Sequence, residues 1–91
     1  MAFYVYIIQS TIDNSFYKGF TENPSVRIIQ HNNGESKYTS NKMPWFFVYI
    51  EERPTKKECL IREKKLKKYS RAQINALIVS EKNEILRILT S

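Results

Sequence analysis

Glycine and proline are scarce in this chain, which has two glycines and three prolines among 91 residues. Because these residue types interrupt regular structure, their scarcity predicts helices and strands joined by short turns over most of the length. The length is that of one domain. A hydrophobic content of 42% is enough for one core and argues against wholesale disorder. We therefore expect a single domain over residues 1–91.

Three segments are predicted to be strands. Residues 3–9 and 16–21 are rich in aromatic and β-branched side chains. The polar residues 11–15 between them are typical of a turn, so the two strands should form a hairpin. Residues 45–51 are apolar enough to predict a central strand.

Capping signals predict the helices. Asn23 followed by Pro24 is a helix start, and Asn33-Gly34 is a left-handed stop. Two capping boxes, which begin at Thr55 and Ser70, start two further helices. An amphipathic segment then either continues the third helix past a bend or restarts as a separate one. The predicted helices cover residues 24–32, 55–68, 70–78 and 80–89. The fold class is therefore α+β, in the order β-β-α-β-α-α with an extra C-terminal helix left open.

Positive charge is concentrated in one part of the chain. The formal net charge is +6, and nine of the fifteen basic residues lie between residues 53 and 71. A basic balance can simply be a solvated surface, but it can also mark a polyanionic partner. The clustering favours nucleic acid as that partner.

Several other classes of protein are excluded or disfavoured. A single cysteine, Cys59, allows neither an internal disulfide nor a zinc site built from cysteines. The first residues lack the basic region of a signal peptide. The longest apolar run, residues 45–50, is far too short to span a membrane. We expect a cytoplasmic protein with no membrane partner.

Glu63 lies on the apolar stripe that we expect for its helix, which comprises Cys59, Leu60 and Leu66. A carboxylate on the core side of a helix is costly unless something pairs with it. One interpretation is a structural ion pair with Arg27 or a lysine. The other is a metal ligand, because a hard oxygen donor suits Mg²⁺.

Arg27 and His31 are four residues apart on the first predicted helix, so they share one edge beside Val26 and Ile29. Both side chains can donate to anionic oxygens. On the strands, Tyr6 and Tyr17 fall on the two arms of the hairpin, where paired residues face the same way. Tyrosine in a strand is commonly only a good β former, so the pattern alone leaves the function of both open.

Taken together, these residues resemble a known family. Val5-Tyr6-Ile7 followed by Tyr17-Lys18-Gly19 is similar to the paired signature of the GIY-YIG endonuclease superfamily. The remaining motifs follow in the order of that family, and the similarity is closest to its short stand-alone members. It covers residues 3–79, which makes residues 80–91 a C-terminal helical extension. These remaining motifs are Arg27 with His31, Lys37-Tyr38-Thr39, and Arg62-Glu63-Lys64.

The resemblance implies a three-stranded antiparallel sheet flanked by helices, with one active site that hydrolyses nucleic-acid phosphodiester bonds, DNA being the expected substrate. Tyr6 and Tyr17 would line the site, Arg27 and His31 would contact the scissile phosphate or the water, and Glu63 would hold one divalent metal. That metal would be Mg²⁺, with Mn²⁺ as a substitute. The general base stays open between the tyrosines and His31. Further phosphate contacts are expected from Lys18, Lys64, Lys65, Lys67 and Lys68.

Two other functions remain open. The first triplet lacks its glycine and Lys18 replaces an aliphatic residue, which fits a nucleic-acid-binding module of the same fold that has lost turnover. Asn75 is the candidate for an asparagine that many members carry late in the domain. Alternatively, the C-terminal helix could bind a protein partner or form a homodimer, although its apolar face could equally close the core. That face comprises Ile85, Leu86, Ile88 and Leu89.

Overall fold

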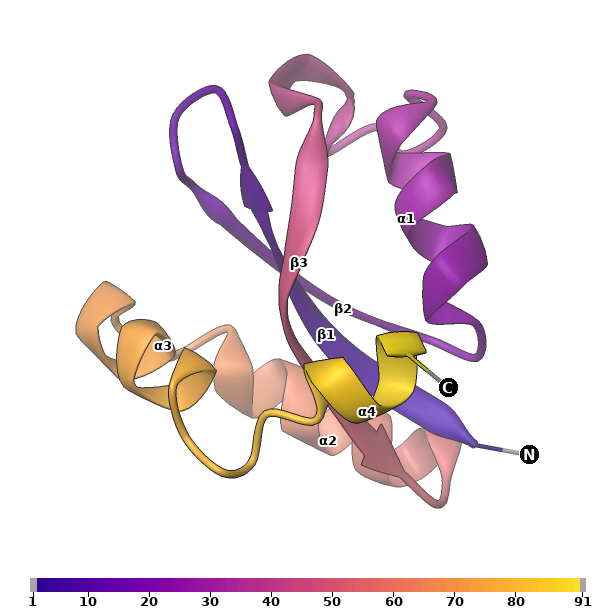
Figure 1. Ribbon diagram of the computed structural model, residues 1–91, viewed down its shortest axis with the longest axis vertical. Coiled ribbons are helices and arrows are strands. Elements are labelled where there is room, and N and C mark those ends of the chain that lie inside the picture. The colour runs from indigo at the N-terminus through magenta and orange to yellow at the C-terminus, as the bar shows by residue number, and fades with distance from the viewer. Residues whose placement is uncertain (1, 91) are drawn as a thin grey trace.

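A computed structural model describes residues 2–90 and shows a three-stranded antiparallel sheet with helices packed on both of its faces (Figure 1). The α+β class and the predicted order are confirmed, and the extra C-terminal helix is present. The elements are β1 Phe3–Ser10, β2 Phe16–Thr21, α1 Pro24–Asn32, a short 3₁₀ helix η1 Ser40–Lys42, β3 Trp45–Arg53, α2 Lys56–Leu66, α3 Arg71–Ile78 and α4 Ile85–Thr90.

The sheet has the order β2-β1-β3, so β1 is central and pairs with both other strands. Tyr6 of β1 lies opposite Gly19 of β2 and Ile50 of β3. The prediction that residues 45–51 form a central strand is wrong, because β3 lies at an edge. Its apolar character has another cause: Tyr49 and Ile50 point to opposite faces, and both faces are covered by helices.

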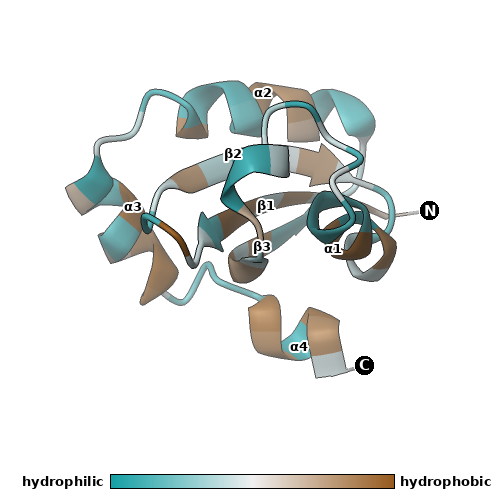
Figure 2. Ribbon diagram, turned by 90° about the horizontal axis from the view of Figure 1, so that it is seen from above, coloured by the Kyte–Doolittle hydropathy of each residue, from teal (hydrophilic) through white to brown (hydrophobic). Residues whose placement is uncertain are grey.

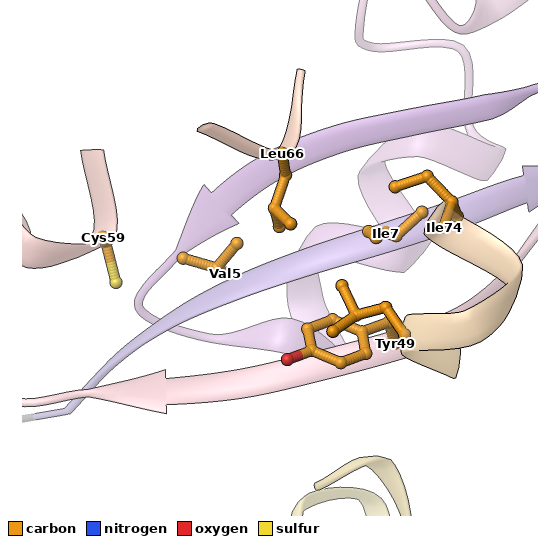
Figure 3. Close-up of a cluster of buried hydrophobic side chains, with 7 residues drawn as sticks. Val5, Ile7, Tyr49, Cys59, Leu66 and Ile74 are labelled. Atoms are coloured by element: carbon orange, nitrogen blue, oxygen red, sulfur yellow. The ribbon is translucent and has the colours of Figure 1, made fainter. Parts of the chain in front are cut away.

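Each face of the sheet carries its own apolar cluster. Under α2 and α3, Val5 and Ile7 of β1 pack with Tyr49, and α2 adds Cys59 and Leu66 (Figure 3). On the other face, Tyr6, Ile8, Trp45 and Ile50 are buried, and residues of α1 and α4 pack over them. Figure 2 shows α2 and α4 on opposite sides of the sheet.

Two helices turn different residues inward than hydropathy predicts. On α1, Ile28 packs on the core while Val26 and Ile29 are 47% and 58% exposed. On α2, the buried residues are Cys59, Arg62 and Leu66, whereas Leu60 is 43% exposed. The predicted stripes are wrong at these positions, because polar side chains, His31 on α1 and Arg62 on α2, occupy part of the inward face.

The segment before α4 covers the outer edge of β3. Asn83 Nδ2 donates to the carbonyls of Val48 and Ile78, both at 2.8 Å, and its Oδ1 accepts from the backbone N–H of Ile50 at 3.3 Å. The N–H of Glu84 then donates to the carbonyl of Ile50 at 2.9 Å. This segment satisfies backbone groups that an edge strand would otherwise leave open to another chain.

The apolar residues of α4 divide between core and solvent. Ile85 and Ile88 pack against the cluster that contains Tyr6, so they close the core. Leu86 is 77% exposed and Leu89 is 43% exposed. None of the helices within residues 2–90 is long and apolar enough to cross a lipid bilayer.

The edge contacts of Asn83 predict that its amide contributes to stability. Asn83→Ala removes four hydrogen bonds, to Val48, Ile78, Ile50 and Ile85. Since each is worth about 1 kcal/mol and water can replace some of them, we expect a loss of about 2–3 kcal/mol in urea denaturation. Asn75→Ala is the matched control, because Asn75 is exposed on α3. Equal losses in the two variants would contradict the proposed role of the edge contacts.

Candidate active site

Tyr6 is the centre of the candidate site. It projects from the central strand toward α1 and is 1% exposed. Its cross-strand neighbour is Gly19, and a Cβ on Gly19 would lie 2.6 Å from the Tyr6 hydroxyl oxygen. The phenol therefore occupies the space that any larger residue at position 19 would need. This close approach gives a physical reason for glycine in the Tyr17-Lys18-Gly19 motif.

His31 holds the Tyr6 hydroxyl from α1. Its Nε2 lies 2.8 Å from the Tyr6 oxygen, and its Nδ1 lies 2.8 Å from Oγ1 of Thr39. The Thr39 hydroxyl points to the carbonyl of Ser36 at 3.5 Å, so it donates there and accepts N–H from His31 Nδ1. We accordingly assign the Nδ1–H tautomer, in which the Tyr6 hydroxyl donates to His31 Nε2.

Burial sets the protonation of this pair. Both His31 and Thr39 are fully buried. Burial, with a smaller effect of the Arg27 charge, lowers the pKa of His31 to about 4, so the imidazole is neutral at pH 7. Burial also raises the pKa of Tyr6 to about 12, although Arg27 opposes that rise.

Tyr17 completes an aromatic group around His31. The Tyr17 ring lies edge-on to His31 with centroids 5.3 Å apart, and the Tyr6 ring does the same at 5.8 Å. Tyr17 pairs with Ile8, which places it on the same face of the sheet as Tyr6. The prediction that both tyrosines face one surface is confirmed. Unlike Tyr6, Tyr17 is only partly buried.

Arg27 and Glu63 influence the pKa of Tyr6 from the two helical layers. Arg27 belongs to α1 and Glu63 to α2, and both act electrostatically on the Tyr6 phenol. Arg27 Nη1 donates to Gln30 at 3.0 Å. Within residues 2–90 the ion pair of Glu63 is with Lys67, at 3.8 Å, and not with Arg27. Of the two structural pairings expected for Glu63, the lysine is therefore the one observed.

The predicted phosphate-binding lysines lie on the α2 side. Lys18 pairs with Ile7 and so points to the face opposite Tyr6. Burial and the nearby charge of Lys67 lower the pKa of Lys18. The other four predicted lysines are exposed on or just after α2, namely Lys64, Lys65, Lys67 and Lys68.

Two features of the site region were missed by reading the sequence. Thr39 lies in the Lys37-Tyr38-Thr39 motif, but nothing in the sequence indicated that its hydroxyl would hold His31. The second is a buried charge cluster on the opposite face, where Arg62 Nε lies 3.2 Å from Glu51 Oε2 and the Tyr49 hydroxyl donates to Glu51 at 2.5 Å. Its signal was Arg62 itself, a charged residue at helical spacing from Cys59 and Leu66.

Comparison with known proteins identifies the family of the chain. The model of the GIY-YIG catalytic domain matches residues 2–75. The chain belongs to the GIY-YIG family. This is a family of nucleases. The family domain ends before Asn83 and α4, so the cap on the edge of β3 lies outside the matched part.

Similar GIY-YIG relatives are small proteins of about this length. A UPF0213 protein of Staphylococcus haemolyticus is 44% identical over 71 residues, which are 77% of this chain and 85% of that protein. A UPF0213 protein of Staphylococcus epidermidis is 42% identical over the same shares of the two chains. The solution structure of the UPF0213 protein BH0048 from Bacillus halodurans is 32% identical, covers 90% of this chain and 87% of its own, and superposes with a TM-score of 0.57.

The buried imidazole predicts a specific pH dependence of stability. The pKa of His31 falls from 6.5 in its ordinary state to about 4 in the fold, so the unfolded chain takes up the proton first. The resulting stabilisation is complete above pH 6.5 and is lost as the pH falls from 6.5 toward 4. His31→Gln, which does not titrate, should lose about 1–3 kcal/mol at pH 7 and show a flatter profile. Thermal denaturation between pH 7 and about pH 4.5 measures both, and parallel profiles would contradict the assignment.

Proposed function

We propose that this GIY-YIG protein is an endonuclease that hydrolyses nucleic-acid phosphodiester bonds, DNA being the expected substrate, with one divalent metal. One observation carries the proposal: Tyr6 is hydrogen-bonded to His31, Tyr17 packs on His31, and the charges of Arg27 and Glu63 both influence the pKa of the Tyr6 phenol. These residues are far apart in the chain and chemically unlike. Their convergence beside Gly19 supports a catalytic use better than a purely structural one.

In this proposal Tyr6 and His31 act as one proton-transferring pair. Because burial raises its pKa to about 12, Tyr6 is protonated at neutral pH and is by itself a poor base. Because its proton already points at the neutral Nε2 of His31, Tyr6 could accept a proton from water as it passes its own to His31. With a pKa of about 4, His31 is a weak acceptor unless the negative charge of a bound phosphate stabilises the imidazolium. The buried His31 then acts through Tyr6. It needs no direct contact with the phosphate or the water, which is the contact that the resemblance implied for it.

Arg27 and Tyr17 are suited to bind the phosphate. Both are only partly buried, and both lie beside Tyr6. The Arg27 guanidinium can donate two parallel hydrogen bonds to phosphoryl oxygens and so stabilise charge that develops in the transition state. Tyr17 can donate one more from its phenol. Neither needs the substrate to enter a closed cavity.

The metal would be held by Glu63. No group of three or more His, Cys, Asp or Glu side chains that could hold a metal ion is found within residues 2–90, so the protein would contribute one carboxylate. A single hard oxygen donor fits Mg²⁺, which keeps most of its waters and is commonly shared with substrate phosphates. Bound there, the ion would neutralise phosphoryl charge and stabilise the leaving oxygen. Mn²⁺ should substitute for it.

A binding module without turnover is the second candidate. The raised pKa of Tyr6 favours it, because almost no phenolate is then present at neutral pH to act as a base. The two candidates share the fold, the basic helix and the expected nucleic-acid partner. They differ in activity. The endonuclease would cleave nucleic acid and would need Glu63 and a metal to do so, whereas the binding module would cleave nothing.

Glu63→Gln separates these candidates. The change keeps the shape of the side chain but removes the charge that would hold the metal. If the chain is an endonuclease, nicking of supercoiled plasmid with Mg²⁺ or Mn²⁺ should fall at least about 100-fold, while DNA binding survives. Glu58→Gln is the matched control, since Glu58 is an exposed capping residue bonded to Thr55 on the same helix. Wild-type protein that fails to nick any plasmid above an EDTA blank would favour the binding module.

The lysines of α2 generate a separate prediction. Changing Lys64, Lys65, Lys67 and Lys68 to Ala should weaken duplex binding and reduce the slope of log K against log salt by up to about 0.9 for each phosphate that the protein no longer neutralises. Lys82→Ala, on the turn before α4, should leave that slope unchanged. Fluorescence anisotropy over a series of salt concentrations gives both slopes. An unaltered slope in the fourfold variant would move the binding face away from α2.

A further inference from the structure

A buried ion pair joins α2 to the far edge of the sheet. Arg62 of α2 is 8% exposed and Glu51 of β3 is 5% exposed, and Arg62 Nε lies 3.2 Å from Glu51 Oε2. The hydroxyl of Tyr49 donates to the other oxygen of Glu51. Arg53, two residues along the same strand, also pairs with Glu51, at 2.5 Å. The cluster lies on the face opposite Tyr6, and the mechanism above makes no use of it.

The hydrogen bonding of Arg62 in this pair is incomplete. Although Arg62 Nε is close to Glu51, Nε and Nη2 are both buried without an aligned hydrogen bond within residues 2–90. A buried ion pair commonly contributes no more to stability than apolar residues of the same volume, because both charges lose their hydration. Cys59 and Leu66 already bury this face of α2 against the sheet (Figure 3). What the ion pair adds is a contact of defined geometry between α2 and β3.

The direction of Arg62 determines the direction of Glu63. Consecutive side chains on a helix point about 100° apart, so fixing Arg62 toward β3 also fixes where Glu63 emerges. A rotation of α2 by about 20° would move the end of a side chain by about 2 Å, given a helix radius of about 5–6 Å with side chains. Misplacements of that size are large for a catalytic carboxylate.

We propose that Arg62 is a positioning residue, whose ion pair with Glu51 sets the rotation of α2 and thereby holds Glu63 at the active site. The inference rests on the proposed function, since it concerns the residue that would hold the metal. It also gives the first residue of the Arg62-Glu63-Lys64 motif a role that differs from the phosphate contacts of the neighbouring lysines.

The test compares Arg62→Met with Arg53→Met. Both variants remove one cation from Glu51, but only Arg62 links α2 to β3, because Arg53 belongs to the same strand as Glu51. The readout is Mn²⁺ binding to the protein without DNA, measured by electron paramagnetic resonance, with Glu63→Gln as the reference for loss of the site. We expect Arg62→Met to weaken Mn²⁺ binding by about 10-fold or more, as for other residues that orient a ligand, and Arg53→Met to leave it unchanged.

The sign of the effect is informative. Removing a positive charge next to Glu63 should by electrostatics alone strengthen the binding of a cation, so weaker binding reports a displaced carboxylate. A double variant, Glu51→Gln with Arg62→Met, separates positioning from stability. In Arg62→Met the buried Glu51 keeps only the half-buried Arg53 as a cation. Replacing that carboxylate with neutral Gln should return the melting temperature toward wild type, while Mn²⁺ binding stays weak.

The outcomes distinguish the positioning role of Arg62 from the proposed metal site at Glu63. If wild type and Glu63→Gln bind Mn²⁺ equally, the proposed metal site fails and the positioning role falls with it. If wild type binds Mn²⁺ in a Glu63-dependent way, and folded Arg62→Met binds Mn²⁺ as tightly as wild type, only the positioning role is overturned. Recovery of both stability and Mn²⁺ binding in the double variant would also overturn it, because Arg62 would then serve the fold alone.

Discussion

The buried hydroxyl of Tyr6 must have a hydrogen-bond partner, because an unsatisfied polar group in a core costs about 1–3 kcal/mol. His31 supplies that partner, and His31 in turn needs Thr39 for its second nitrogen. The backbone of Thr39 is held by the indole of Trp45, which donates to its carbonyl at 2.8 Å. One phenol in the central strand thus ties together α1, the loop after it and the start of β3, and it requires Gly19 beside it.

Residues of both helical layers influence the Tyr6 phenol. Tyr6, Tyr17 and His31 lie on the α1 face, whereas Glu63 and the basic residues belong to α2 on the other face. β2 is an edge strand, and its Gly19 carries no side chain. Arg27 and Glu63 both influence the pKa of the Tyr6 phenol although they come from opposite layers. Positive charge on α2 would then lie close to any phosphate bound there, which suits a polyanionic ligand.

Much of the fold was predictable because its signals are local. Asn23, Thr55 and Ser70 each cap a helix as expected, and the hairpin register places Tyr6 and Tyr17 on one face. The position of β3 was not predictable from its composition, since an edge strand that is covered on both faces is as apolar as a central strand.

The prediction of which residues of α1 and α2 face the core was wrong for a related reason. Hydropathy assumes that polar residues face water, yet His31 and Arg62 are buried because Tyr6 and Glu51 meet them from the sheet. Which polar residues have such partners depends on contacts between distant segments, and no local pattern encodes them. For the same reason Thr39 could be quoted as part of a motif but not given a role.

The sheet therefore carries a buried polar network on each face, which is unusual for a domain this small. A chain of 91 residues has little apolar surface to spare, and apolar replacements at such sites are often neutral or stabilising. Local rules are most often broken where a protein gives up stability for function. On the α1 face the buried polar residues are Tyr6 and His31, which belong to the candidate site. On the α2 face they are Glu51 and Arg62, and Arg62 is the sequence neighbour of Glu63. The network on the α1 face thus contains two residues of the candidate site, and the network on the α2 face contains the sequence neighbour of a third, Glu63.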